Sequence, residues 1–272
     1  AELGATTTGV FSGKYEPYRL MCDEIDITII SFTDMLNYPF EGSDFNVLRM
    51  TDEVLMEIQK ASDAGSFVVV YAHVGSLFCS FPNPLTRAFL HKCVESGAKL
   101  IVTVHSHVIG GIEEYKGVPI VHSLGDFYMD GSSQRRRTSM GVLVEINGSH
   151  ARIVDHEFFS CSRVFKIMNL KEKKRRTQKW KLSYVSQVMK YCKDDKYNII
   201  YRLLYKIEIL SHIMSTVKFL LNERSISGFF KLIIARREEA RRLFFWMLFD
   251  RSKLTRDDDA LQKSKVHNIN DV

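Results

Sequence analysis

The sequence predicts an α/β domain over residues 1–168, followed by a basic helical region over residues 169–272. Two observations indicate this division. Apolar strands alternate with helical segments in the first part, which is typical of βαβ units around a mostly parallel sheet. The charge also divides, because residues 1–170 carry 14 Lys and Arg against 20 Asp and Glu, whereas residues 171–272 carry 24 against 12. The net charge of +12 therefore favours anionic partners for the second part only.

The first part alternates in the order strand, helix, strand, helix, strand. Its apolar, β-branched runs EIDITIISF, FVVVYAH and LIVTV predict strands at 25–32, 67–73 and 100–104. Thr51 is placed to cap the first helix, and the second helix follows Pro84 and stops at Gly97. Because successive strands of βαβ units lie in one sheet, we expect these three strands to be parallel. Each should lie directly beside the next one, or be separated from it by one strand.

Two hairpins are predicted after the third strand. The segment EEYKGVPIVHSL is expected to turn at Lys116 and Gly117. The segment GVLVEINGSHARIVDHEF contains Asn147-Gly148, a pair that favours a type I′ turn. The sheet is therefore expected to become antiparallel at its end.

The second part predicts two long helices, at 197–221 and 225–249. The first has a wide apolar face, which we expect to be covered either by the other helix or by a membrane surface that Lys and Arg would support. Nucleic-acid binding is not favoured, because the helices are aromatic and apolar rather than cationic along one face. The sequence shows no apolar stretch of about eighteen residues and no signal-peptide pattern. It leaves the location in the cell open.

Three histidines follow or end predicted strands. His73 ends the second strand, and His105 and His107 follow the third, where alternation along an extended chain points both side chains the same way. The carboxyl ends of parallel strands meet at one edge of a sheet, which is where ligands bind. Three imidazoles suit Zn, Mn or Fe, whereas the alternative is that they only form hydrogen bonds to loop carbonyls. Spacing alone leaves both interpretations open.

Several motifs resemble those of a known family. The segments TTTGVFSGKYEPYRL, FVVVYAHVGS and ESGAKLIVTVHSHVIGGIEEYKGVPIVHSLGDF are similar to bacterial poly-gamma-glutamate capsule synthesis proteins of the CapA/PgsA type, within the calcineurin-like metallophosphoesterase superfamily. The resemblance covers roughly residues 1–160. By this likeness His73 matches the family's His-Trp-Gly histidine, and His105 and His107 match its His-Pro-His.

The resemblance implies a metallophosphoesterase-like sandwich of mixed sheets with flanking helices. It implies a divalent metal (Mn, Zn or Fe) on the three histidines, in a two-metal site, with Ser123, Gly125 and Asp126 beside the substrate. The implied substrate is an anionic polymer or a phosphoester, and capsule-synthesis proteins and the cell envelope are the implied surroundings. Two functions remain open: metal-dependent hydrolysis, and a non-catalytic scaffold role in capsule assembly that keeps the fold.

The chain also departs from the family pattern. Val74 replaces the tryptophan of His-Trp-Gly, Ser106 replaces the proline of His-Pro-His, and Asp126 replaces the asparagine of Ser-Leu-Gly-Asn-Phe. Asp126 would add a ligand or repel an anionic substrate. The superfamily's early Asp-x-His, Gly-Asp and Asn-bearing motifs do not occur. We therefore expect this chain to be the C-terminal portion of a longer protein, and expect it to bind metal weakly and to hydrolyse nothing by itself.

Four other residues are weaker candidates. Asp34 and Asn37 follow the first strand, where both residue types are ordinary turn formers. Ser76 and Ser123 would need a positioned base to act as nucleophiles, and no Gly-x-Ser-x-Gly elbow is present.

Overall fold

The computed structural model describes residues 8–34, 46–128, 137–162, 166–192 and 194–222. Its strands are β1 (Val10–Phe11), β2 (Tyr18–Cys22), β3 (Ile25–Thr33), β4 (Asn46–Val47), β5 (Phe67–His73), β6 (Ala98–Val104), β7 (Ile112–Tyr115), β8 (Val118–His122), β9 (Thr138–Asn147), β10 (His150–Cys161) and β11 (Ile167–Asn169). Its helices are α1 (Asp52–Asp63), α2 (Pro84–Glu95), α3 (Glu172–Tyr191) and α4 (Asp194–Asn222).

The central sheet has six strands in the order β2-β3-β5-β6-β8-β7. The inner strands β3, β5, β6 and β8 are parallel, and the outer strands β2 and β7 pair antiparallel with their neighbours. The prediction of a parallel sheet that becomes antiparallel at its end is confirmed for this sheet. Thr33, His73 and Val104 lie side by side in the register, so the carboxyl ends of β3, β5 and β6 meet at one edge.

A second, antiparallel sheet has the order β11-β10-β9. Its hairpin is where the sequence predicted one, but the predicted turn type is wrong. Asn147 pairs with His150, so the central residues are Gly148 and Ser149 rather than Asn147 and Gly148. Of these only Gly148 has a positive φ, 58°, which fits a type II′ turn because that turn needs a positive φ at its first central residue alone.

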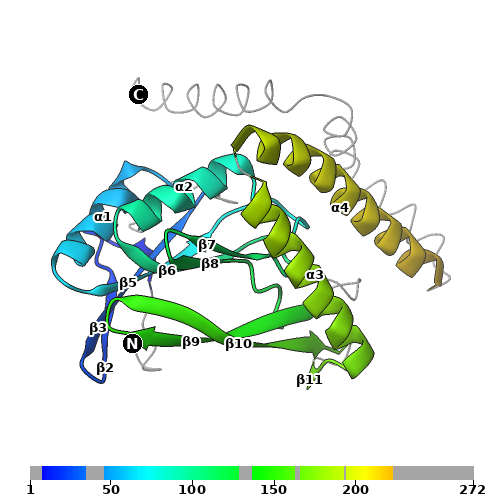
Figure 1. Ribbon diagram of the computed structural model, residues 1–272, viewed down its shortest axis with the longest axis horizontal. Helices are drawn as coiled ribbons and strands as arrows, with labels where there is room; N and C mark the ends of the chain where they lie inside the picture. The colour runs from blue at the N-terminus through cyan, green and yellow to red at the C-terminus, as the bar shows by residue number, and fades with distance from the viewer. Residues whose placement is uncertain (1–7, 35–45, 129–136, 163–165, 193, 223–272) are drawn as a thin grey trace. The chain divides into compact units, whose positions relative to one another are not determined.

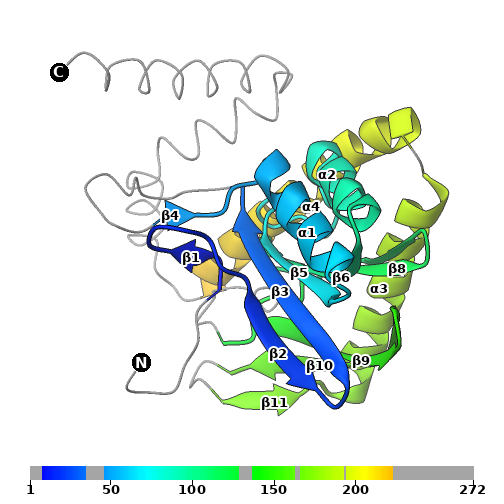
Figure 2. The same cartoon turned by 90° about the vertical axis from the view of Figure 1, so that its left-hand side faces the viewer.

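The two faces of the central sheet are covered differently. Figures 1 and 2 show α1 and α2 on one face and the β9–β10 hairpin on the other. Val54 and Ile58 of α1 and Leu90 of α2 are fully buried in the first layer. Ala151 of β10 packs with Leu100 of β6 in the second. The fold is therefore mixed α/β with mixed sheets and flanking helices, as the sequence predicts.

The C-terminal helices continue the first compact unit of the chain, which runs to Ile213. The boundary predicted between residues 168 and 169 marks the start of helical structure, and α3 and most of α4 belong to the same compact unit as the sheets. Tyr197 and Met189 are buried where α3 and α4 meet. Within the described residues no helix has both the length and the hydrophobicity to cross a membrane. The helix predicted at 225–249 lies outside the described residues.

Gly110 sits at a close approach between two backbone segments. A Cβ there would overlap the carbonyl oxygen of His122, and the Gly110 N–H donates to Ser123 O at 3.0 Å. We expect Gly110→Ala to lower the free energy of unfolding by about 1–3 kcal/mol, because the backbone must shift to accept the methyl group. Gly141→Ala is the matched control in urea denaturation, since its Cβ would meet only the edge of the Phe159 ring, at 3.2 Å. Equal losses in the two variants would contradict this expectation.

Candidate metal centre

β5 and β6 bring two of the predicted histidines into contact. His73 Nε2 and His105 Nδ1 lie 2.9 Å apart, so one nitrogen donates a hydrogen bond to the other. The His107 ring follows, with its centroid 6.1 Å from that of His105. All three lie at the carboxyl edge of the parallel strands, because His73 pairs with Val104 in the register. The three rings therefore lie near one another at this edge, and their convergence on one metal stays a prediction.

Asp126 joins this cluster through His107. His107 Nδ1 donates to Asp126 Oδ1 at 2.7 Å, and the Asp126 side chain is only 13% exposed. A carboxylate in this position keeps the proton on Nδ1 and leaves Nε2 as the acceptor, which is the usual arrangement behind a metal-bound imidazole. Asp126, one of the three departures from the family pattern, thus lies within the cluster.

The backbone around the cluster is strained. Four non-glycine residues here have a positive φ: Phe78 at 58°, His105 at 123°, His107 at 57° and Ser123 at 74°. Such conformations cost about 1–3 kcal/mol each for residues with a Cβ, and they persist only where the surrounding structure imposes them. Strain of this kind concentrates at functional sites, so its presence at both histidines favours a functional role for them.

Burial keeps two of the histidines neutral. Burial, with smaller contributions from the neighbouring His73 and His107, lowers the pKa of His105 to about 4. Burial also lowers the pKa of His73, with a smaller contribution from His107. Near pH 7 both rings are therefore uncharged. The ring that donates the hydrogen bond between them keeps a lone pair that can bind a cation, whereas the lone pair of the acceptor ring is engaged in that bond.

The weaker sequence candidates fall into two groups. Asp34 lies at the same edge as His73, because its N–H donates to His73 O and its Oδ2 accepts from Gly75 N, both at 3.4 Å. Ser76 Oγ is hydrogen-bonded to the Tyr201 hydroxyl at 2.8 Å, and Ser123 Oγ accepts from the N–H of Gly125, so neither contact activates a nucleophile. Asn37 lies outside the described residues.

Two buried atoms of the cluster have no hydrogen-bond partner among the described residues. They are His105 Nε2 and Asp126 Oδ2. Imidazole nitrogen and carboxylate oxygen suit Zn, Mn or Fe. Within the described part of the chain, however, no three His, Cys, Asp or Glu side chains are grouped as a set of metal ligands. The donor chemistry fits a divalent cation, and the donors are arranged as two pairs, His73 with His105 and His107 with Asp126.

Comparison with known proteins finds similarity over the part of the chain that contains this edge of the sheet. Residues 13–131 match the family model described as "Bacterial capsule synthesis protein PGA_cap". The chain is 32% identical over 118 residues to "PGA biosynthesis protein CapA" of Bacillus subtilis (strain 168), a match that covers 42% of this chain. It is 33% identical over 113 residues, 40% of this chain, to "Capsule biosynthesis protein CapA" of Bacillus anthracis. It spans 31% and 28% of the lengths of these two relatives.

A solved structure is also similar to the chain. It is the calcineurin-like phosphoesterase YfkN from Bacillus subtilis, with a TM-score of 0.30 and 14% sequence identity over 62% of this chain and 57% of that chain. At these values the description of the fold rests on the sheet topology alone.

Helix α4 lies outside the matched residues 13–131 and holds the loop that follows His73 in place. Three hydrogen bonds join helix and loop: between the hydroxyls of Tyr201 and Ser76 at 2.8 Å, from the Ser80 N–H to Glu208 Oε2 at 2.8 Å, and from the Tyr197 hydroxyl to Pro82 O at 2.7 Å. The His212 ring also stacks on the Phe78 ring, with 3.9 Å between the ring centroids. Phe78 in turn lies beside His107, with ring centroids 6.3 Å apart. The C-terminal helices therefore support one wall of the candidate metal centre.

The hydrogen bond from the Ser80 N–H to Glu208 is the contact between α4 and the loop in which the acceptor is a carboxylate. We expect Glu208→Ala to increase the hydrogen-exchange rate of the Ser80 amide, because that amide loses a hydrogen bond to a charged acceptor, worth about 1.5–3 kcal/mol. Hydrogen exchange read by mass spectrometry on the loop peptide is the measurement. Lys206→Ala, an exposed change on the same helix, is the control. Unchanged exchange in Glu208→Ala would show that α4 does not hold the loop.

A buried charge network links α2, the hairpin β7–β8 and the end of α3. Glu113 accepts from Arg87 Nε and Nη2 at 3.0 and 2.6 Å, and also bonds His91 at 2.9 Å and His122 at 3.0 Å. Arg87 further donates to the carbonyl oxygen of Met189 in the last turn of α3. Sequence analysis did not single out this network, because Arg87 and Glu113 lie on different elements and form no local motif.

Proposed function

We propose that this chain forms part of a metal-dependent hydrolase that acts on a phosphoester or on an anionic, capsule-type polymer. One observation supports the proposal most directly. The hydrogen-bonded pair His73–His105 and the pair His107–Asp126 lie at the same edge of the sheet, which is partly buried and has a strained backbone. The names of the two relatives refer to PGA and capsule biosynthesis, which supports a polymer of the capsule type. Contact with other capsule-synthesis proteins at the cell envelope is part of the same proposal.

The residues of the cluster take distinct parts in this proposal. His73, His105 and His107 are the ligands for a divalent cation, and Asp126 orients His107 through Oδ1 while its Oδ2 remains available. A cation bound here would polarise a phosphoryl or carbonyl oxygen of the substrate. Asp34, whose Oδ2 accepts from the Gly75 N–H beside His73, provides another carboxylate at this edge.

Metal analysis together with a hydrolysis assay on the natural-length protein tests the proposal. We expect bound Mn, Zn or Fe after dialysis, and hydrolysis of bis(p-nitrophenyl) phosphate or p-nitrophenyl phosphate that a chelator removes and added manganese restores. Protein that binds no metal and hydrolyses neither compound after manganese is added would overturn it. That result would favour the non-catalytic scaffold role in capsule assembly.

A further inference from the structure

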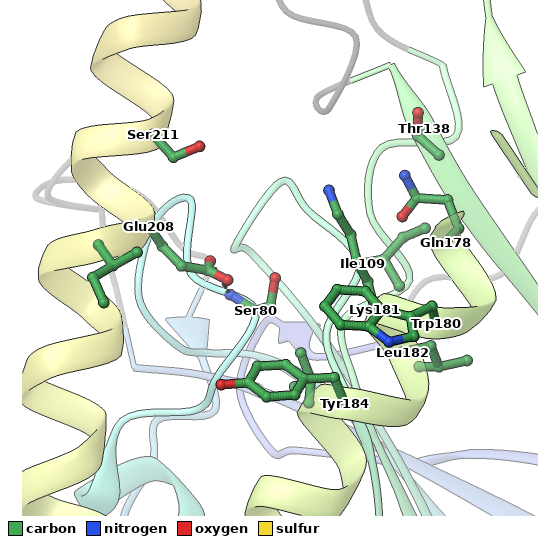
Figure 3. Close-up of a pocket in the computed structure, with 12 residues that line it drawn as sticks. Ser80, Ile109, Thr138, Gln178, Trp180, Lys181, Leu182, Tyr184, Glu208 and Ser211 are labelled. Atoms are coloured by element: carbon green, nitrogen blue, oxygen red, sulfur yellow. Dashed lines mark hydrogen bonds between the residues drawn. The ribbon is translucent and has the colours of Figure 1, made fainter. Parts of the chain in front are cut away.

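A pocket of about 240 Å³ lies between α3 and α4, and its lining residues differ from those of the histidine cluster. Figure 3 shows Trp180 and Tyr184 of α3 on one side and Glu208 and Ser211 of α4 on the other. Its volume is below the roughly 300 Å³ at which pockets for drug-sized ligands begin. The pocket therefore suits one or two small units of a longer molecule.

The α3 side of the pocket is an aromatic surface. The rings of Trp180 and Tyr184, one helical turn apart, are nearly parallel, with an angle of 9° between their planes and 5.8 Å between their centroids. Trp180 is 66% exposed and Tyr184 is 43% exposed. A pair of exposed, parallel rings offers a flat apolar face with a polar group at its edge, which is the arrangement that binds a flat amphipathic partner.

The opposite side of the pocket is polar and fixed in position. Glu208 Oε2 accepts from the Ser80 N–H at 2.8 Å, so its carboxylate is anchored, and the hydroxyl of Ser211 lies on the next turn of α4. Gln178 of α3 and Thr138 of β9 complete the polar lining. Hydroxyl, amide and carboxylate groups together provide both hydrogen-bond donors and acceptors.

The charge of the pocket is balanced. Lys181 and Glu208 are the charged residues in its lining, so it contributes one positive and one negative charge. A polyanion such as a γ-glutamyl chain or a nucleic acid would place its carboxylates or phosphates near the Glu208 carboxylate, which costs free energy through like-charge repulsion. A neutral ligand with many hydroxyl groups and an apolar face avoids that cost.

From these features we infer that the pocket binds a neutral pyranose unit of a polysaccharide. The C–H face of the sugar ring stacks on Trp180 and Tyr184, and its hydroxyl groups bond Glu208 and Gln178. Two lining residues connect the pocket to the histidine cluster. Ile109 is two residues after His107 in the chain. Thr138 is next to Ser139, which pairs with Gly125, the residue before Asp126. A sugar held here keeps a polymer at the side of the candidate metal centre. Sugar binding does not depend on metal, so it can be tested whether or not the cluster binds a cation.

Titration calorimetry and saturation-transfer NMR on the metal-free, natural-length protein test this inference. The probes are chitotetraose and cellotetraose, whose equatorially linked rings present C–H faces. We expect saturable binding that Trp180→Ala weakens about tenfold, because the larger stacking surface is lost. Trp180→Phe, which keeps a ring, should retain most of the affinity. Tyr191→Ala removes an exposed aromatic side chain of the same helix outside the pocket, and should change nothing.

Three results would overturn the inference. One is the absence of saturable binding to both oligosaccharides, and another is binding that Trp180→Ala leaves unchanged. The third is tighter, salt-sensitive binding of a γ-glutamate oligomer or a short oligothymidylate than of either sugar, which would show a surface for polyanions instead. Trp180 is largely exposed, so loss of binding in its variants will not reflect unfolding, and circular dichroism checks this directly.

Discussion

His105→Ala is expected to reduce metal binding by the natural-length protein at least about tenfold and to remove any hydrolysis that depends on the metal. His105 contacts His73 directly, and its Nε2 is buried without a hydrogen-bond partner among the described residues. Loss of an outer-shell group alone typically lowers metal affinity by about 10–100-fold, so loss of a ligand should cost no less. Equilibrium dialysis with manganese or zinc, followed by metal analysis, is the measurement.

The matched control for this prediction is His150→Ala. His150 is exposed in the β9–β10 hairpin, where its Nδ1 lies 3.2 Å from Ser149 Oγ. The substitution His150→Ala also removes one imidazole from the protein, but it leaves the candidate metal centre intact. Equal metal content in the wild type, His105→Ala and His150→Ala would contradict a role for the cluster in metal binding.

Glu113→Gln is expected to lower the free energy of unfolding by about 3–5 kcal/mol. The change leaves the buried Arg87 guanidinium without its carboxylate partner, and breaking one side of a buried ion pair typically costs this much. Urea denaturation followed by circular dichroism measures the loss. Glu114→Gln, one residue further along the same strand but exposed, is the matched control and should change stability by less than about 0.5 kcal/mol.

The same network predicts a pH dependence. Burial raises the pKa of Glu113, but hydrogen bonds from His122, His91 and Arg87 outweigh it and hold the pKa well below its usual range. A carboxyl group whose pKa is lower in the folded state stabilises the fold above its unfolded pKa of about 4.3, and this contribution is lost as the pH falls below that value. Wild type should therefore lose stability below about pH 4.3 more steeply than Glu113→Gln. Parallel curves for the two proteins would contradict the assignment.

The helices of the basic region have two structural roles in this protein. The C-terminal turn of α3 is bound by Arg87 through the carbonyl oxygens of Met189 and Cys192, and Arg87 also stacks over the Tyr197 ring at 4.4 Å. Helix α4 then contacts the loop that begins with His73. Glu113→Gln and Glu208→Ala therefore disturb the same helices at different points, one through the buried charge and one through the loop of the candidate metal centre.

The order of strands and helices in the α/β part was predictable from the sequence alone. β-branched runs such as FVVVYAH are typical of strands in a parallel sheet, and Gly97 and Pro84 mark where helices end and begin. His73, His105 and His107 were predictable for the same reason, since residues at the carboxyl ends of neighbouring parallel strands must lie at one edge. Local patterns carry this information because they depend on residues close together in the chain.

Contacts between distant segments were decided only by the tertiary structure. Asp126 reaches His107 because a positive φ at Ser123 redirects the chain after β8, and nothing in the local sequence indicates that pairing. Glu113 meets Arg87 across 26 residues, and Glu208 meets Ser80 across 128. Such pairs depend on how helices pack against a sheet, and each polar residue looks like an ordinary surface residue in its own segment. The pocket between α3 and α4 arises in the same way, because Trp180 and Glu208 face each other only once both helices have packed on the sheet.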